Sequence, residues 1–331
     1  MTELPTGLTV RPPKLTDAEA IHRLAASYFQ RIVGRPMVTL SEIVEGLTAP
    51  TITLERDGWL ILGNEDNEGN EVNDSQPAGY GFVLLGGDRR FVQLSVVKED
   101  PAIATWLLTK GSERAQELGA ENGYQEVIVE VGMFRADDTL REVVAGQGFE
   151  FATSYQQMRI DHEGPLPLPE PPTGTTIRTG AHDDPTRRAF HTMMSAAFAG
   201  QDSAALAPYD EWLETHEKRD GFDWSQLTMV ERDGRIIAAS DCNHAFVETD
   251  NCGYIGRLGV LPEGRGLGLA KYLLRRAFAQ DANAGLAGTL LHVDTSNPTP
   301  ALGLYESVGM RTVEIADGWQ RKLPVLQQPA T

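Results

Sequence analysis

The spacing of hydrophobic and polar positions divides the second half of the chain into short, regular segments. Apolar residues recur at helical intervals, which predicts helices over residues 187–198, 209–218, 268–283 and 301–308. Short apolar and β-branched runs predict strands over residues 227–231, 235–241, 254–261 and 289–294. Strands followed by alternating helices and strands are typical of a mixed α/β sheet covered by helices.

The two halves of the chain repeat short sequence landmarks in the same order. The tripeptide TVR at residues 9–11 is echoed by TIR at residues 176–178, and ERDG at residues 55–58 recurs at residues 231–234. Each ERDG stands where a turn would join two strands of a hairpin. Landmarks repeated in one order predict a duplicated domain.

A proline-rich stretch separates the two halves. Residues 161–174 read DHEGPLPLPEPPTG, and prolines favour an extended, semi-rigid spacer. A chain of 331 residues is long for one core. We therefore expect a first domain over residues 1–160, a linker over residues 161–174 and a second domain over residues 175–331. The polar, acidic residues 63–77 predict a mobile surface loop.

Composition narrows the classes of partner. The formal net charge of -18 disfavours a nucleic-acid backbone and is compatible with a cationic or neutral small molecule. Cys242 and Cys252 are the two cysteines, too few for a disulfide framework and without zinc-site spacing, so we expect no metal. The chain shows neither an export signal nor an apolar run of about 20 residues, which predicts a cytoplasmic protein with no membrane partner. The oligomeric state, monomer or homodimer, stays open.

The most informative motif joins an expected strand to an expected helix. Residues 258–270 read LGVLPEGRGLGLA, with glycines concentrated where the strand turns into the helix. Glycines allow close backbone approach, and N–H groups at a helix start converge with the positive end of the helix dipole, which favours a phosphate. The spacing matches neither a P-loop nor the dinucleotide fingerprint.

This motif resembles one from a known enzyme family. The run RGLGLA at residues 265–270 is similar to the R-x-x-G-x-A signature of the GNAT acetyltransferases. Asn297, Ala301, Tyr305 and Gly309 stand in the order of that family's second motif, although Met310 replaces the usual phenylalanine. The resemblance implies an α/β fold (α+β, mixed sheet) of two tandem GNAT-fold domains. Each domain would hold a central twisted mixed β-sheet flanked by helices.

The resemblance also implies roles for residues, with acetyl-CoA as co-substrate and no metal. The backbone of Leu258, Gly259 and Val260 would bind the pantetheine arm and polarise the thioester carbonyl. Tyr305, a phenol that stays protonated at neutral pH, would give a proton to the departing CoA thiolate. The remaining residues expected to bind the coenzyme are Arg265, Gly266, Leu267, Gly268, Leu269, Ala270 and Asn297.

The residue that takes the proton of the acceptor amine stays undecided. Strand alternation puts His292 and Asp294 on one face. Further candidates on or near the preceding hairpin are Asp241, His244 and Glu248.

The first half has lost the features of such a site. Residues 94–108 retain neither the arginine nor a glycine of the turn, and Asp100 would put negative charge where the pyrophosphate should lie. Val144 stands at the position of Tyr305 and has no proton to give. We therefore expect the first domain to serve as a scaffold or substrate wall.

The resulting hypothesis is an acetyl-CoA-dependent N-acetyltransferase. A small-molecule primary amine would attack the thioester directly, in the C-terminal domain. The tandem layout resembles mycothiol synthase and its actinobacterial relatives, but Tyr254 stands where that synthase would have a glutamate base, and a neutral phenol is a poor substitute. The alternatives are a mycothiol synthase-like activity and a non-catalytic acyl-CoA-binding sensor or scaffold.

Overall fold

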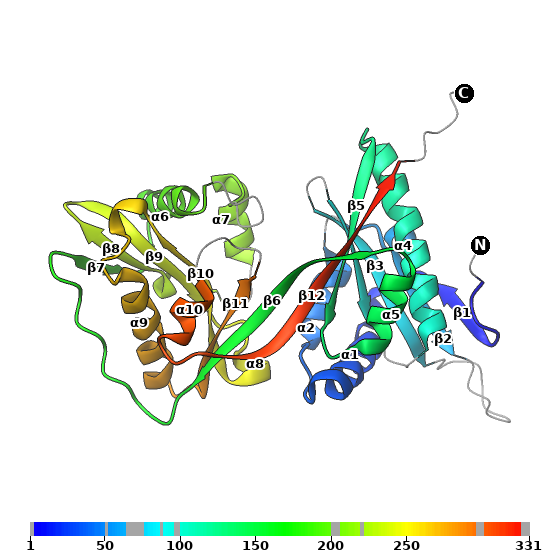
Figure 1. Ribbon diagram of the computed structural model, residues 1–331, viewed down its shortest axis with the longest axis horizontal. Helices are drawn as coiled ribbons and strands as arrows, with labels where there is room; N and C mark the ends of the chain where they lie inside the picture. Colours follow the sequence, from blue (N-terminus) through cyan, green and yellow to red (C-terminus); the bar gives the residue numbers. More distant parts are fainter. Residues whose placement is uncertain are drawn as a thin grey trace. The chain divides into compact units, whose positions relative to one another are not determined.

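The structure is a computed structural model, in which two compact units are formed (Figure 1). It describes residues 3–49, 52–63, 76–86, 89–95, 100–199, 206–218, 222–295 and 301–325. The first unit comprises Met1–Tyr155 and Glu314–Thr331, and the second unit comprises Gln156–Val313. The surface loop expected over residues 63–77 lies almost entirely outside the described residues and stays a prediction.

The first unit is a sheet covered by helices. Its elements are β1 (Leu8–Arg11), η1 (Leu15–Asp17), α1 (Ala18–Val33), α2 (Leu40–Thr48), α3 (Leu54–Asp57), β2 (Gly58–Gly63), β3 (Pro77–Gly86), β4 (Arg89–Ser95), α4 (Pro101–Glu121), β5 (Glu126–Phe134), α5 (Asp138–Gly146) and the start of β6 (Glu150–Asp161). Helix α4 supplies Ile103, Leu107 and Leu108 to a buried cluster that also holds sheet residues. Burial of this apolar face stabilises the unit.

The second unit repeats that order of elements. It contains the end of β6, then β7 (Thr176–Thr179), α6 (Asp184–Ala197), α7 (Tyr209–Lys218), η3 (Trp224–Gln226), β8 (Thr228–Arg232), β9 (Arg235–Asn243), α8 (Val247–Asp250), β10 (Cys252–Val260), η4 (Pro262–Gly264), α9 (Leu269–Asn283), β11 (Gly288–Asp294), α10 (Ala301–Glu306) and the start of β12 (Arg311–Pro324). Both units run strand, two helices, three strands, helix, strand, helix, strand, apart from short additional helical turns. This correspondence confirms the predicted duplication and mixed α/β fold.

Helix α9 shows why the second unit holds together. Its buried side chains include Leu269, Leu273 and Ala277, while Lys271 and Arg275 are exposed. The helix packs against β9, β10 and β11, and its apolar residues enter two buried clusters on one face of the sheet. Helix α6 supplies Met194 to a different cluster, on the other face. The sheet is therefore covered on both faces, the arrangement that hides both sides of a mixed sheet from water.

The last strand does not stay with the second unit. Over its final nine residues, from Ala316 to Pro324, β12 pairs antiparallel with Glu126–Phe134 of β5. The predicted second domain, residues 175–331, includes this strand, whereas the contacts group residues from Glu314 onward with the first unit. A strand's hydrogen bonds can be made at any sheet edge that the chain reaches, so sequence position alone does not assign it.

A truncation tests this arrangement. We expect a fragment of residues 1–160 to aggregate, because it lacks β12 and leaves the β5 edge without nine registered partners. Size-exclusion chromatography and circular dichroism of the fragment would measure this. Co-expression with residues 161–331 should restore a soluble complex, and a monodisperse, folded 1–160 fragment would contradict the expectation.

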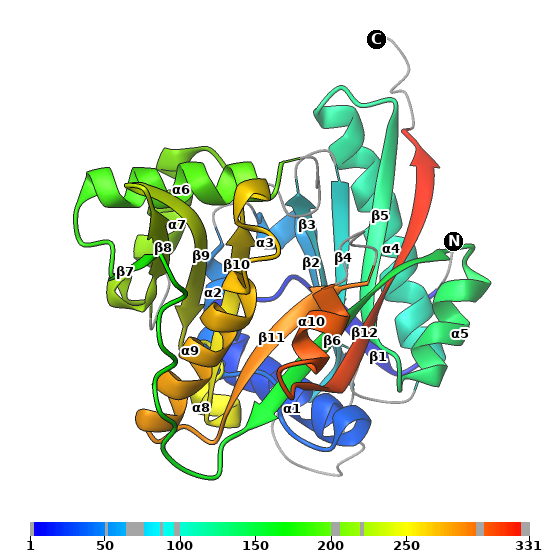
Figure 2. The same cartoon turned by 60° about the vertical axis from the view of Figure 1, so that its left-hand side comes forward.

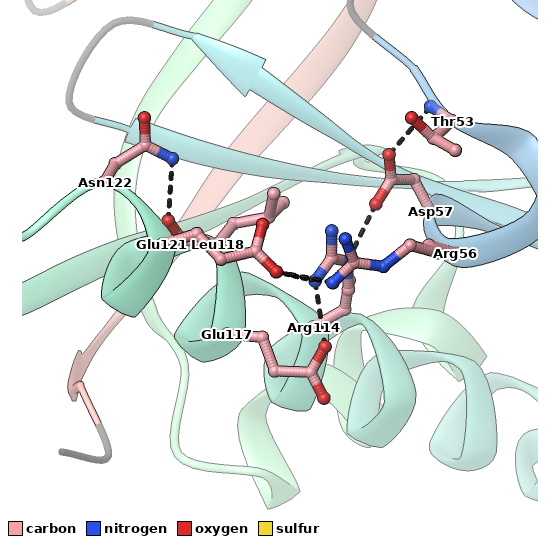
Figure 3. Close-up of polar contacts among 8 residues, drawn as sticks. All are labelled: Thr53, Arg56, Asp57, Arg114, Glu117, Leu118, Glu121 and Asn122. Atoms are coloured by element: carbon pink, nitrogen blue, oxygen red, sulfur yellow. Dashed lines mark hydrogen bonds and ion pairs between the residues drawn. The ribbon is translucent and has the colours of Figure 1, made fainter. Parts of the chain in front are cut away.

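A buried ion pair joins α3 to α4 in the first unit (Figure 3). Arg114 Nε donates to Asp57 Oδ1 at 2.7 Å, and each side chain is only 6% exposed. Asp57 Oδ2 accepts from the Thr53 backbone N–H at 2.8 Å, and Arg114 also bonds Glu117 and Glu121. Burial by itself would lower the pKa of the Arg114 guanidinium. The hydrogen bonds to these carboxylates together have the larger effect, so the pKa is raised. The network fixes the position of the turn that leads into β2.

Candidate active site

Two parallel strands of the second unit part in the middle of the sheet. The pairing of β10 with β11 runs from Cys252 opposite Gly288 to Ile255 opposite Leu291. Beyond that point β10 continues to Val260 paired with β9, while β11 runs on to Asp294. A shift of register between Ile255 and Arg257 accompanies the separation. Leu258, Gly259 and Val260 thus belong to the part of β10 that no longer pairs with β11.

The glycine turn stands directly after this part of β10 (Figure 2). Gly266 and Gly268 have φ of 77° and 76°, a conformation that L side chains rarely adopt. A Cβ at either position would meet no atom within 4 Å, so the turn faces open space. Gly268, the expected first residue of this helix, is the N-cap of α9, which begins one residue later at Leu269, and no side chain accepts a bond at this cap. No acidic residue lies in the first turn of α9. The turn therefore offers backbone N–H groups and a helix dipole to an anion.

The residues expected to hold the coenzyme fall on three successive pieces of chain. Leu258, Gly259 and Val260 close β10, and η4 follows. Turn residues Arg265, Gly266, Leu267 and Gly268 are exposed, and Leu269 and Ala270 begin α9. Asn297 lies outside the described residues, so its place in the site stays a prediction.

Tyr305 belongs to the side of the sheet that carries α9 and α10. It is half-buried on α10 and packs against the cluster that contains buried Ile255, Leu291 and partly buried Leu258. Ile255 and Leu291 are the last paired residues of the two strands. Burial raises the pKa of the Tyr305 phenol. Tyr305 thus packs against the same buried cluster as the last paired residues of β10 and β11, and its raised pKa keeps the phenol protonated at neutral pH.

The corresponding strands of the first unit part in the same way. The pairing of β4 with β5 ends at Phe91 opposite Glu130, while β4 pairs with β3 as far as Ser95. The helix that follows is capped differently, because the Asp100 side chain accepts from the Ala102 N–H at 2.8 Å. The Asp100 carboxylate therefore occupies the N-terminus of α4, the position at which an anionic ligand would have to bind.

A cavity of about 220 Å³ lies at the starts of α4 and α5 in the first unit. Three carboxylates line it, those of Asp100, Asp137 and Asp138, together with Arg31. Val144, which stands where the second unit has Tyr305, is fully buried. An acidic lining repels a diphosphate, so the first unit lacks the features that make the second a candidate site.

The face of the sheet opposite Tyr305 holds a tyrosine–histidine pair. Tyr254 on β10 and His292 on β11 are joined by a hydrogen bond of 3.0 Å between the Tyr254 Oη and His292 Nδ1. The Phe246 ring packs against both rings, at centroid distances of 4.9 and 5.7 Å. Burial lowers the pKa of His292, although its side chain still reaches solvent.

The other proton-acceptor candidates have different surroundings. Asp241 is 3% exposed, and its Oδ2 lies 3.2 Å from Nε2 of His216 on α7. His244 follows β9 and bonds the Gln226 side chain, and Glu248 lies on α8. Sequence reasoning missed His216, which is 25 residues from Asp241 and carries no motif.

The described part of the chain offers neither a membrane-spanning helix nor a cluster of metal-ligating side chains. None of its helices has the length and apolar character needed to cross a bilayer. No group of three or more His, Cys, Asp or Glu side chains there is arranged to hold a metal ion.

Comparison with known proteins identifies the family. The model of the acetyltransferase (GNAT) family matches residues 189–310, which include the glycine turn and Tyr305. Mycothiol acetyltransferase of Streptomyces coelicolor is 31% identical over 304 residues, covering 85% of this chain and 94% of that protein. Mycothiol acetyltransferase of Thermomonospora curvata is 33% identical over 170 residues, or 50% of this chain. The matched region spans about half, 54%, of that relative's length.

Solved structures agree on the fold. A GCN5-related N-acetyltransferase from Sphaerobacter thermophilus superposes with a TM-score of 0.81 at 23% identity, covering 98% of this chain and 99% of that one. A tandem GNAT protein from the clavulanic acid biosynthesis pathway gives a TM-score of 0.66 at 15% identity, covering 95% and 98%. These likenesses confirm the predicted tandem GNAT fold. The chain belongs to the GNAT family of acetyltransferases.

Proposed function

We propose that this chain is an acetyl-CoA-dependent N-acetyltransferase that acetylates a small-molecule primary amine in its second unit. One observation carries the proposal: β10 and β11 part directly before a glycine turn whose helix has no side-chain cap. The gap suits the extended pantetheine arm, and the turn suits the pyrophosphate. The first unit, with Asp100 capping its own helix, serves as a scaffold or substrate wall.

The chemistry follows from what surrounds the thioester in this arrangement. Backbone N–H groups of Leu258, Gly259 and Val260 on the side of β10 that no longer pairs with β11 stabilise the oxyanion that forms when the amine attacks the carbonyl carbon. The new C–N bond forms as the C–S bond breaks, and Tyr305 gives its proton to the departing thiolate. Arg265 and the N–H groups of the turn hold the pyrophosphate.

A mycothiol-type acceptor is the second candidate within this class. It is favoured by the relative from Streptomyces coelicolor, which bears the name mycothiol acetyltransferase and is matched over 94% of its length. Tyr254 argues for a different way of removing the amine proton, because a phenol alone is a weak base at neutral pH. The acceptor is therefore best found by assay.

The proposal is tested by measuring release of CoA thiol from acetyl-CoA in the presence of a panel of amines. The panel should include amino sugars, amino-acid derivatives, aminoglycosides and the acceptor used by mycothiol acetyltransferases. We expect at least one amine to raise thiol release far above the rate without acceptor, and mass spectrometry to show the acetylated amine. Thiol release that no amine increases would contradict the proposal.

Coenzyme binding is tested separately by reversing one charge. We expect Arg265→Glu to weaken CoA binding by roughly 10- to 100-fold in a calorimetric titration, because a charge-assisted hydrogen bond is lost and a repulsion is added. Arg275→Glu is the matched control, since Arg275 is an exposed arginine on α9, beyond the turn that holds Arg265. Equal affinity in both variants would remove the pyrophosphate assignment.

A further inference from the structure

The Tyr254–His292 pair lies at the point where the two strands separate. Tyr254 directly precedes Ile255 on β10, and His292 directly follows Leu291 on β11, so the pair flanks the last registered residues. Ile255 and Leu291 point into the cluster that contains Tyr305. Because successive side chains of a strand alternate, Tyr254 and His292 point to the opposite face.

That opposite face is the one from which an acceptor can approach a thioester held between the strands. It carries Gly259, at which an added Cβ would meet the Met194 Sδ of α6 at 2.8 Å, and Asp241, which contacts α7. Arg257 stands opposite Asp241 in the register of β10 with β9 and so shares this face. Protonation of the departing thiolate by Tyr305 would therefore take place on one face of the sheet, and attack by the amine beside the Tyr254–His292 pair on the other.

The hydrogen bond sets the direction in which a proton can move. In the neutral tautomer that carries its proton on Nε2, His292 accepts the Tyr254 hydroxyl at Nδ1. Phe246 packs on both rings and holds them in this orientation. A phenol bonded to a neutral imidazole can accept a proton on its oxygen while it passes its own proton on.

We propose that Tyr254 and His292 together take the proton of the acceptor amine. This inference rests on the proposed function of the second unit. As the amine nitrogen bonds to the thioester carbon, its proton moves to the Tyr254 oxygen, and the phenolic proton moves to Nδ1 of His292. The imidazolium then releases a proton to solvent, which its exposed side chain reaches. Tyr305 protonates the thiolate and is reprotonated from solvent, so the products are the amide and the CoA thiol. Tyr254 is the catalytic residue, and His292 acts through it.

The alternatives on this face are less suited to the task. Asp241 lies on this face but is buried under α7, with its side-chain Oδ2 3.2 Å from Nε2 of His216. The charged groups on this face or on the elements beside it include Asp241, Arg257, Asp294, Arg159, Asp161, Arg235, Glu248 and Asp250. The lowered pKa of His292 comes from burial. His292 is therefore neutral, and able to accept a proton, at the pH where the enzyme would work.

The test uses the full chain with the amine that gives the highest thiol release. We expect Tyr254→Phe and His292→Asn each to lower kcat by about 10²-fold, because either change breaks the proton path. Asparagine retains an acceptor for the Tyr254 hydroxyl but does not take up its proton. The double variant should be no slower than the slower single variant, since both residues serve one step. Tyr209→Phe, which removes a phenol that bonds Asp184 on α6, is the matched control.

The pH profile separates proton transfer from a structural effect. A neutral His292 is required, so kcat/KM of the unchanged enzyme should fall in acid, at a pH below the ordinary imidazole pKa because burial lowers the pKa of His292, and this limb should disappear in His292→Asn. Unchanged CoA affinity and unfolding temperature show that the variants fold. A variant that raises KM for the amine without lowering kcat, or that keeps the acid limb, overturns the proposal. If the unchanged enzyme acetylates no amine, the proposed function fails first and this proposal fails with it.

Discussion

Tyr305→Phe is expected to lower kcat for amine acetylation by about 10³-fold, or about 4 kcal/mol of transition-state stabilisation. The substitution keeps the ring that packs against the buried cluster containing Ile255 and Leu291, and removes only the proton donor. Because burial raises the pKa of this phenol, Tyr305 stays protonated through neutral and mildly alkaline pH. The rate of the unchanged enzyme should therefore not fall between pH 7 and about 9 through loss of this proton.

Steady-state thiol release, with CoA affinity measured in parallel, checks this result. The affinity for CoA should be unchanged, since the lost interaction develops only as the thiolate leaves. Tyr272→Phe is a suitable control, because Tyr272 is a buried tyrosine on α9 of the same unit. An unchanged kcat in Tyr305→Phe would show that the thiolate leaves without help from this residue.

Arg114→Met is expected to lower the free energy of unfolding by about 3–5 kcal/mol, the second large effect. The change leaves the buried Asp57 carboxylate without its cation, although the Thr53 N–H still bonds it. Replacing one member of a buried pair exposes the full cost of desolvating the other. Urea unfolding followed by circular dichroism would measure the loss.

The double variant Arg114→Met with Asp57→Leu provides the control. Both charges are then absent, so much of the stability should return, and the interaction energy of the pair follows from the cycle.

The dependence of stability on pH adds a second check. Arg114 holds the pKa of Glu121 below its usual range, so the stability from this contact is present at neutral pH and is lost as pH falls through that lowered pKa. Arg114→Met should remove this part of the acid dependence; single and double variants of equal stability would contradict the assignment.

Local features of the second unit were predictable because they depend on neighbouring residues. The helix expected over residues 209–218 matches α7, and the helix expected from residue 268 begins one residue later, at Leu269. The glycines of the turn were readable for the same reason, since a positive φ at Gly266 and Gly268 is a property of the local backbone. The likeness of the two halves was visible in the sequence as the repeated tetrapeptide ERDG and the similar tripeptides TVR and TIR, and the structure shows it as a matching order of elements.

The side-chain contacts on the face of the sheet where the acceptor would bind could not be predicted from neighbouring residues in the sequence. Tyr254 and His292 are 38 residues apart, and a phenol considered alone is a poor base. Only the parallel pairing of β10 with β11 puts an imidazole beside it. His216 and Asp241 meet because α7 packs on the face of β9 that carries Asp241. The spacing of the two residues in the sequence does not predict this contact.

By itself, then, the sequence determined the periodic helices and strands, the duplicated order and the glycine turn with Tyr305 after it. Each of these follows from residues within a few positions of one another. Only the tertiary structure decided that β12 completes the first unit, that β10 and β11 part after Ile255, and that Tyr254 bonds His292. Those features depend on which strands meet, and strand pairing is settled by the free energy of the whole sheet and core rather than by local preference.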